Sequence, residues 1–414
     1  MCITIKTFFT IAFISIIAGN LSAQQFCRTA TRQNFTSSKQ ISDNPAIKWK
    51  FKTNGQVYSS PVLFDDKIIT GSCDSNLYAL NKTGGSVIWK FKTGGEIRSS
   101  AAIENNTVFF ISTDGIFYAL DVKTGKQIWA FKTGGEKFYD AWDYYQSSPA
   151  ISNGTVYFGC GDVYVYALNA TSGKLLWKYK TNGIVHASPT IADNAILIGS
   201  FDGFFYCINA DGALRWKFDT IGEHYFPLGE VQFNATVTDS TVFFCSRDYN
   251  VYALKIRNGG GHWVYHQPGS WTSVPSLADK RLIVTMSDAH SILGFGKTYG
   301  FKLYETPVPL NVFSSASLND SSAYFGCIDG ALYKLDIISG KVSMIFQTEL
   351  SKEHHADFID ADGKLREDVI EKYKDDATPL YTEFLKMGSI FSTVWIDNGT
   401  LYFGSSDGYI YALE

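Results

Sequence analysis

Acidic residues recur along this chain where they could act as catalytic acids or metal ligands. Eight segments each carry an Asp, with a Pro, Ala or Val always 13 positions before it. These residues are Asp74, Asp114, Asp162, Asp202, Asp248, Asp288, Asp329 and Asp407. A Tyr follows four positions later in every copy except the sixth, which has Ile292. Because a repeated turn explains an acid without any chemistry, we interpret these carboxylates as turn caps that accept backbone N–H bonds.

One position of the repeat varies where the others are constant, and it is the main candidate for ligand contact. It lies three residues before the Pro, Ala or Val and holds Tyr58, Arg98, Gln146, His186, Gln232, Thr272, Phe313 and Phe391. We expect these side chains to line an axial funnel, where Arg98 would bind an anion and the aromatic rings would stack on a ligand. A water-filled funnel without a ligand is the alternative.

Aromatic side chains also gather in two of the longer connections, residues 134–145 and 221–230. The candidate rim residues are Tyr139, Trp142, Tyr144, His224 and Tyr225. Such a composition is common on surfaces that bind carbohydrate or peptide, because functional residues concentrate in loops on a rigid scaffold. The alternative is a loop that packs its own aromatic rings on the rim.

A possible metal site lies in the longest connection, residues 349–388. The candidate ligands are His354, Asp360 and Asp362. Asp360-x-Asp362-Gly363 resembles part of a calcium-binding EF-hand loop, but Phe358 and Val369 stand where that loop requires Asp and Glu. We therefore predict no metal ion there.

The sequence lacks the motifs of common hydrolases. It contains neither a Gly-x-Ser-x-Gly nucleophile elbow nor a His-Glu-x-x-His zinc motif. Isolated histidines on strands are more often packed or hydrogen-bonded than catalytic. We assign no catalytic residue.

The repeat itself must position these candidate residues. Repeats of about 40 residues with short strands and Gly-containing turns are typical of β-propeller blades. In the second repeat, we predict strands at 97–103, 107–112, 116–121 and 126–133. The fourth strand carries a Trp in six copies, and we place Lys302 and Met344 at the equivalent positions in the other two. These rings would pack against the neighbouring blade.

The chain termini predict how the ring closes. A lone fourth strand, residues 47–53, opens the repeats, and the last repeat ends after three strands. We predict an all-β, eight-bladed β-propeller of four-stranded antiparallel blades, closed by pairing of the N-terminal strand with the C-terminal three. The predicted divisions are a signal peptide (1–23), an N-terminal extension (24–46) and the propeller (47–414).

All long connections join a fourth strand to the next first strand, so one face of the propeller should be rich in loops. The longest of them, residues 349–388, is charged and has Leu365, Val369 and Tyr373 at helical spacing. We predict a short amphipathic helix there, lying over this face as a lid.

Composition and the N-terminus indicate an exported protein. The 414 residues are 45% hydrophobic and carry a formal net charge of −4, which makes nucleic acid an unexpected partner. Lys6, the apolar run 8–18 and the small residues before Gln24 fit a signal peptide. We expect a periplasmic or extracellular monomer with no membrane span and no lipid anchor, because Cys27 does not follow the cleavage site directly.

Six cysteines remain after Ala23, an even number in an oxidising compartment. Their spacing places most of them at strand ends in different blades, where a small buried residue is expected. The alternative is a disulfide between adjacent blades, with Cys160 and Cys207 as the candidate pair, which requires their Cα atoms to approach within about 7 Å.

The run Ala119-Leu120-Asp121-Val122-Lys123-Thr124-Gly125-Lys126-Gln127-Ile128-Trp129 resembles the tryptophan-docking motif of the PQQ-like, quinoprotein-type β-propeller repeat family. The resemblance covers residues 47–414. It implies either a dehydrogenase that uses pyrroloquinoline quinone (PQQ) and calcium or a protein of the BamB-like branch without a cofactor. The dehydrogenases typically have adjacent cysteines, which this sequence lacks.

We therefore expect a non-catalytic binding or scaffold protein with no cofactor, whose partner is a protein or an envelope polymer. The alternative is a PQQ-dependent periplasmic dehydrogenase with a divergent site. A structural spacer within a larger complex is a third hypothesis. Fold resemblance alone does not decide among these three functions.

Overall fold

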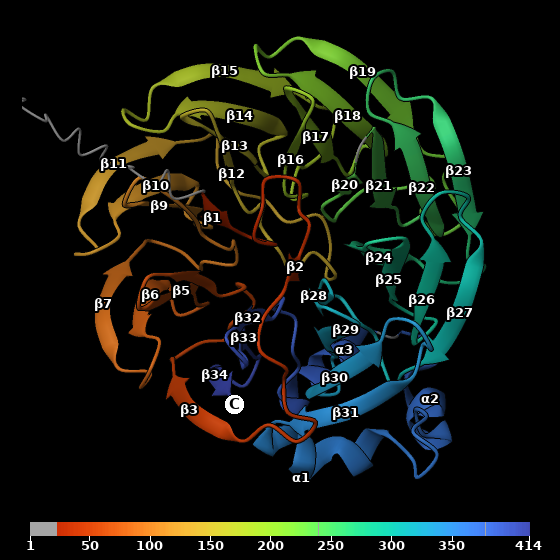
Figure 1. The fold of residues 1–414 in the computed structure, drawn as a ribbon. Helices are drawn as coiled ribbons and strands as arrows, with labels where there is room; N and C mark the ends of the chain where they lie inside the picture. Colours follow the sequence, from red (N-terminus) through yellow and green to blue (C-terminus); the bar gives the residue numbers. More distant parts are fainter. Residues whose placement is uncertain (1–22, 239, 377) are drawn as a thin grey trace, which may run out of the picture.

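Eight sheets surround a common axis in the computed structural model, which describes residues 23–238, 240–376 and 378–414 (Figure 1). The predicted eight-bladed, all-β propeller of four-stranded antiparallel blades is confirmed. The first 22 residues, with nearly all of the predicted signal peptide, lie outside the described residues.

Each blade runs from an innermost strand at the axis to an outermost strand at the rim. Blades 1 to 4 are β4–β7 (Val62–Phe64, Lys67–Gly71, Asn76–Asn81, Val87–Lys92), β8–β11 (Ala102–Glu104, Thr107–Ile111, Ile116–Asp121, Gln127–Lys132), β12–β15 (Ala150–Ser152, Thr155–Gly159, Tyr164–Asn169, Leu175–Lys180) and β16–β19 (Thr190–Ala192, Ala195–Gly199, Phe204–Asn209, Leu214–Asp219). Blades 5 to 7 are β20–β23 (Thr236–Thr238, Thr241–Cys245, Asn250–Lys255, Gly261–His266), β24–β27 (Thr272–Ala278, Arg281–Met286, Ser291–Gly296, Lys302–Pro307) and β28–β31 (Ser317–Asn319, Ser322–Gly326, Ala331–Asp336, Val342–Gln347). Strand β8 is shorter than predicted from the sequence, since it begins at Ala102 and not at residue 97.

Blade 8 joins the two ends of the chain, as predicted. Strands β32 (Trp395–Asp397), β33 (Thr400–Gly404) and β34 (Tyr409–Leu413) pair with β3 (Ile47–Lys52), which supplies the outermost strand. Beyond this ladder, the main chains of Ala46 and Glu414 exchange two hydrogen bonds of 2.8 and 2.9 Å. No edge strand is left open at this seam.

The repeated Asp residues cap turns and also join neighbouring blades. In blade 1, Asp74 accepts a 3.0 Å bond from the backbone N–H of Asn76 and a 2.6 Å bond from the hydroxyl of Tyr78. Its second oxygen also accepts from the backbone N–H of Asn54, at the end of the outermost strand of blade 8. The same Asp–Tyr pair forms in every blade except blade 6.

The outermost strands carry the rings that dock one blade on the next. Trp89 of blade 1, for example, donates its indole N–H to the carbonyl of Val122 in blade 2 at 2.9 Å and covers Gly125. A Cβ atom at Gly125, which has a φ of +69°, would lie 2.7 Å from this ring. In blade 6, Tyr304 takes this place, with its hydroxyl 3.1 Å from the carbonyl oxygen of Ile337. The prediction of Lys302 at this position was therefore wrong by two residues.

Hydroxyl groups link the blades around the hub. The main-chain N–H of Ser60 donates to Oγ of Ser100, that of Ser100 to Ser148, and that of Ser148 to Ser188, each at 2.9 Å. Across the seam, the N–H of Thr393 donates to Oγ of Ser60 at 2.8 Å. The small residues at the axis thus hold the innermost strands together and do not merely leave space for packing.

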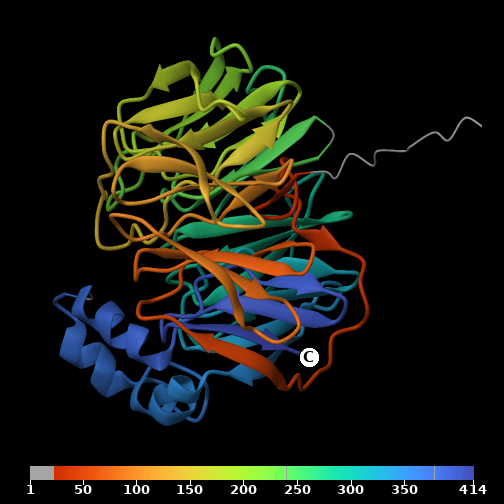
Figure 2. The same ribbon diagram turned by 90° about the vertical axis from the view of Figure 1, so that its left-hand side faces the viewer.

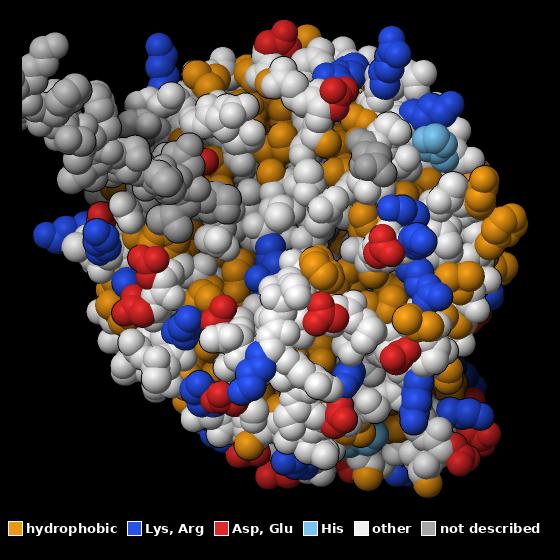
Figure 3. All heavy atoms as spheres, in the orientation of Figure 1, with side chains coloured by type: hydrophobic (Ala, Val, Ile, Leu, Met, Phe, Trp, Pro, Cys, Tyr) orange, Lys and Arg blue, Asp and Glu red, His pale blue; other side chains and the backbone are white. Residues whose placement is uncertain are grey.

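Residues 24–46, which we call the strap, cross the hub on one face of the propeller (Figures 1 and 2). Strand β1 (Gln24–Gln25) pairs with β8 of blade 2, and β2 (Phe35–Thr36) pairs with β28 of blade 7. Between them, the buried Arg32 donates to main-chain oxygens of Phe26, Ser148 and Pro189. The strap therefore closes this end of the axis. Basic and acidic side chains are interspersed on this face (Figure 3).

Three α helices and a 3₁₀ helix project from the opposite face (Figure 2). They are α1 (Glu349–Phe358), α2 (Glu367–Tyr373), α3 (Thr378–Phe384) and η1 (Leu385–Met387). Only the region of α2 was predicted as helical. Helix α1 has no apolar periodicity, and its one buried residue is Ser351, whose hydroxyl donates to the carbonyl of Asp329 at 2.6 Å. Polar contacts of this kind leave no periodic signal in a sequence.

All six described cysteines are free, so the open Cys160–Cys207 pairing does not form in this structure. Five of the six are buried and Cys73 is partly exposed, which matches the interpretation of most of them as small buried residues. Among the described residues, no helix has the length and apolarity needed to span a membrane.

We expect a chain that begins at Asn54 to lose its single cooperative unfolding transition in calorimetry. Such a chain lacks β3, so blade 8 would expose the edge of β34 and the ring would open. A chain that begins at Ile47 keeps β3 and lacks only the strap, and it serves as the control. An unchanged melting curve for the shorter chain would show that the ring does not depend on this closure.

Candidate functional site

Variable ring residues from several blades meet at the hub, but most of the eight are sealed inside the protein. Seven are buried, and Arg98 alone remains partly exposed, with 21% of its side-chain surface accessible. Aromatic rings fill the space between blades 7, 8 and 1, where Phe391 lies 5.1 Å from Tyr58 and 5.9 Å from Phe313, centroid to centroid. The described residues therefore form a packed hub and not an open funnel.

The loop of residues 134–145 plugs the hub from the loop-rich face. Tyr144 inserts among the ring aromatics, with its centroid 4.7 Å from that of Phe391. The neighbouring Tyr145 donates its hydroxyl to the carbonyl of Phe391 at 2.9 Å. The cavity left on the axis, between this loop and Phe26 of the strap, measures ≈ 30 Å³. Since one water molecule needs roughly 10–15 Å³ on this measure, the cavity has room for about two.

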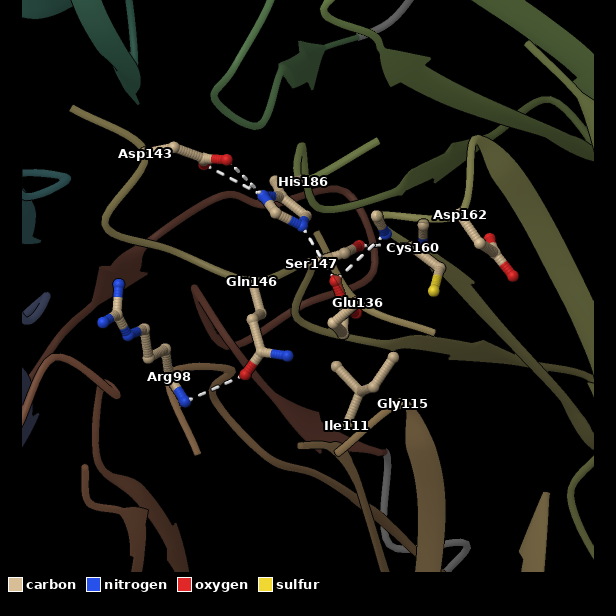
Figure 4. Close-up of polar contacts among 12 residues, drawn as sticks. Arg98, Ile111, Gly115, Glu136, Asp143, Gln146, Ser147, Cys160, Asp162 and His186 are labelled. Atoms are coloured by element: carbon tan, nitrogen blue, oxygen red, sulfur yellow. Dashed lines mark hydrogen bonds and ion pairs between the residues drawn. The ribbon is translucent and has the colours of Figure 1, made fainter. Parts of the chain in front are cut away.

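A buried ion triad fixes this loop to the hub. Nδ1 of His186 lies 2.8 Å from Oδ2 of Asp143, and its Nε2 lies 3.0 Å from Oε2 of Glu136 (Figure 4). All three side chains are at most 1% exposed. Burial alone would lower the pKa of His186, but the two carboxylates outweigh it and raise the pKa to about 10. The imidazole is therefore a structural cation and not a proton-transfer group near neutral pH.

A second buried cation, Arg247, holds the same loop from blade 5. Its guanidinium donates to Asp140 of the loop and to Oε1 of Gln232 at 2.7 Å. Its Cζ also lies 4.4 Å from the ring centroid of Trp271 and 5.1 Å from that of Phe201. Our sequence analysis missed Arg247. One signal was available, because no other copy has a charged residue directly before the repeated Asp.

A pocket of ≈ 360 Å³, which we call the mouth pocket, opens on the loop-rich face above the hub. Its walls come from three parts of the chain, namely the hub (Gln56, Tyr58, Arg98), the loop (Phe138 and residues 140–144) and the insertion (Thr378, Tyr381, Thr382, Leu385). Four of the predicted site residues outside the buried triad thus meet here, and these are Tyr58, Arg98, Trp142 and Tyr144.

Arg98 is the one cation in the wall of this pocket. Its Nε donates to Glu96 at 2.7 Å, and its backbone N–H donates to Gln146 (Figure 4). The guanidinium carbon lies 4.6 Å from the ring centroid of Phe138 and 5.4 Å from that of Tyr58, which fixes the plane of the group. Asp140 and Asp143 in the same wall are already paired with Arg247 and His186.

The predicted rim residues occupy three different environments. Tyr144 belongs to the hub, and Trp142 lies beneath α3 with its ring centroid 3.8 Å from that of Tyr381. Tyr139, His224 and Tyr225 lie at the surface. The exposed fractions reach 73% for Ile221 and 76% for Tyr225, which are large values for apolar side chains.

The weak metal candidates do not come together. His354 contacts Asp357 on the exposed side of α1 at 3.1 Å. One oxygen of Asp360 caps a tight turn, where it accepts 2.9 Å bonds from the backbone N–H groups of Asp362 and Lys364. Within the described ranges, no group of three or more His, Cys, Asp or Glu residues is arranged to hold a metal ion.

Comparison with solved structures places this fold among known propellers. BamB from Moraxella catarrhalis matches with a TM-score of 0.66 and 17% identity over 89% of this chain and 97% of that one. Quinohemoprotein alcohol dehydrogenase from Comamonas testosteroni matches with a TM-score of 0.70 and 11% identity over 94% of this chain and 80% of that one. Identities this low establish similarity of fold alone.

Sequence comparisons find short matches to two enzymes and an extended match to one family model. Beta-alanine-activating enzymes of Mus musculus and Homo sapiens are 31% and 32% identical to this chain over 93 and 98 residues. These segments are only 8% and 9% of the lengths of the two enzymes. The family model described as "Outer membrane protein assembly factor BamB" matches residues 36–210, 142–228 and 206–363, which is more than half of the chain.

The ion triad makes stability depend on pH in a defined direction. The pKa of His186 is about 10 in the folded protein and 6.5 for an unperturbed imidazole, so its contribution to folding stability is complete below pH 6.5 and is lost as pH rises toward 10. We expect His186→Gln to destabilise the protein by roughly 3–5 kcal/mol at pH 6 and by less at pH 10, because it leaves two buried carboxylates unpaired. Urea unfolding of both proteins at pH 6, 8 and 10 measures the difference. A difference that does not shrink with pH would contradict the charged triad.

Proposed function

Because the chain belongs to the family described as outer membrane protein assembly factor BamB, we propose that it is an exported, non-catalytic propeller that binds a partner protein through its loop-rich face. The exported state rests on the signal-peptide pattern of residues 1–23. The propeller acts as a monomer that presents one binding face. An envelope polymer is the other class of partner that the sequence suggests.

The observation that carries this proposal is the contrast between the inner and outer sides of two loops. The inner side of residues 134–145 is fixed by buried charges, and Glu230 ties the end of the second loop to Tyr139 through a 2.8 Å hydrogen bond. The outer side exposes Tyr139 and, on the second loop, Ile221, Tyr225 and Leu228. Rigid loops that hold apolar side chains in water lose little entropy on binding, which favours association with a protein surface.

The mouth pocket supplies a polar anchor beside this apolar surface. Glu96 accepts a hydrogen bond from Nε of Arg98, and the side chain of Arg98 lines the pocket. Aromatic rings on either side restrict its movement. This arrangement suits a planar carboxylate, such as an acidic side chain or the C-terminus of a partner.

A PQQ-dependent dehydrogenase is the second candidate, because the fold also matches quinohemoprotein alcohol dehydrogenase. The residues present do not fit that cofactor. The axial cavity of ≈ 30 Å³ is far smaller than a three-ring quinone, and Tyr144 and Tyr145 occupy the entrance. The carboxylates of the mouth pocket are already paired with Arg247 and His186, which leaves neither of them as a free calcium ligand.

We expect the double variant Ile221→Ser, Tyr225→Ser to lose most of its partner binding, by tenfold or more, without loss of thermal stability. Both side chains are more than 70% exposed, so their removal affects an interface and not the core. The measurement is quantitative co-purification of envelope proteins with the parent and the variant.

The matched control is Tyr299→Ser, Phe301→Ser. These residues are 73% and 70% exposed but flank the outermost strand of blade 6, away from the two loops. Equal loss in both double variants would indicate non-specific adhesion, and no loss in the loop variant would refute the proposed face.

A cofactor assay separates the two candidate functions. Purified protein mixed with PQQ and Ca²⁺ should show neither a bound-quinone absorbance change nor alcohol-dependent dye reduction, because the axial cavity is too small and the aspartates of the mouth pocket are already paired with Arg247 and His186. Reduction of the dye at a rate that saturates with PQQ would establish the dehydrogenase instead.

A further inference from the structure

Blade 6 departs from the repeat at one polar pair. Its Asp288 lacks the Tyr found four residues later in the other copies, since Ile292 stands there and is buried. In the other seven blades, that Tyr donates its hydroxyl to the Asp at 2.6 to 2.8 Å. The carboxylate of Asp288 is therefore left without its usual partner from the same blade.

A tyrosine from the insertion takes the missing place. The hydroxyl of Tyr381 in α3 donates to Oδ1 of Asp288 at 3.3 Å and accepts from Nδ2 of Asn311 at 3.0 Å. Asn311 also donates to Oδ1 of Asp288 at 3.2 Å and is fully buried. The one vacancy in the repeated Asp–Tyr pattern is thus filled by a residue 93 positions further along the chain.

The same tyrosine closes one side of the mouth pocket. Tyr381, Thr378, Thr382 and Leu385 form its insertion wall, and the ring of Tyr381 meets that of Trp142 edge to face at a centroid distance of 3.8 Å. Both ends of the insertion are fixed by other contacts. The hydroxyl of Ser351 donates to a carbonyl of blade 7, and the hydroxyl of Ser406 in blade 8 donates to the carbonyl of Leu385. Helix α3 buries Leu380 and Phe384 as well, and Tyr381 is the residue that joins it to Asp288 and Asn311 and to Trp142 of the loop.

We propose that α3 is a lid on the mouth pocket, latched by the hydroxyl of Tyr381 on Asp288 and Asn311, and that release of this latch opens the pocket to its ligand. The role in ligand entry rests on the proposed function, whereas the latch itself can be tested without any ligand. Replacement of the blade's own Tyr by Ile292 leaves Asp288 available to the lid.

Hydrogen exchange of the full mature protein tests the latch. We expect Tyr381→Phe and Asp288→Asn each to raise the exchange rates of amides in residues 378–387 by about tenfold, since the first removes the hydrogen bond and the second removes the charge that strengthens it. The matched control is Tyr206→Phe, which removes the equivalent 2.6 Å bond to Asp202 in blade 4 and should leave α3 unchanged.

A variant that restores the repeat pattern in blade 6 tests the latch independently. Ile292→Tyr restores the standard tyrosine of blade 6, which would compete with Tyr381 for Asp288. We expect it to raise exchange in α3 as the two loss variants do. If all three variants exchange like the parent, Tyr381 is not a latch and the proposal fails.

Access to the pocket is measured by the rate at which phenylglyoxal modifies Arg98, read by peptide mass spectrometry. The latch variants should raise this rate severalfold, while the exposed Arg257 serves as an internal reference. Faster exchange in α3 without faster modification of Arg98 would show a mobile helix that does not gate the pocket, which also overturns the proposal. Failure of the proposed function would instead appear as partner binding that survives the loop-tip substitutions.

Discussion

The propeller depends on the docking of an outermost-strand ring on a glycine of the next blade. Each ring covers a turn whose glycine has a positive φ, and a Cβ atom there would lie less than 3 Å from the ring. The indole N–H completes the contact by bonding to a carbonyl of the same turn, as Trp129 does with Ala170 at 3.0 Å. The contact forms at seven of the eight junctions between blades, including the one at which blade 8 covers Gly85 of blade 1.

The exception to this contact, at Met344 of blade 7, follows from the way the ring closes. Blade 8 has no turn between its third strand, β34, and its outermost strand, β3, because these two strands come from opposite parts of the chain. Among the described glycines, none lies against Met344 of blade 7 as the others lie against their docking rings. Tyr304 of blade 6 does face a turn, at Gly340, and it keeps both the ring and the hydrogen bond to a carbonyl.

Most of the fold could be predicted from the sequence, whereas the state of the hub could not. Repeat spacing fixes blade number, strand order and closure, since each depends on local turns and on one shared docking contact. The burial of ring residues such as Phe391 depends on segments that lie far away in the chain. Tyr145 enters from one face and Arg32 from the other, and neither belongs to the repeat. A position that varies between blades therefore signals departure from the repeat without revealing whether water or protein fills the axis.

Departures from the repeat concentrate where the loop-rich face is built. His186 and Arg247 each bury a cation that other blades lack, and Ile292 removes a tyrosine that they retain. Each is costly within its own blade, because a buried charge requires a partner and an unpaired Asp loses a bond. In every case the compensating group comes from an insertion. Glu136 and Asp143 pair with His186, Asp140 pairs with Arg247, and Tyr381 bonds to Asp288. Blades and insertions are thus matched to each other, as expected if selection acts on the shape of this face and not only on the stability of the ring.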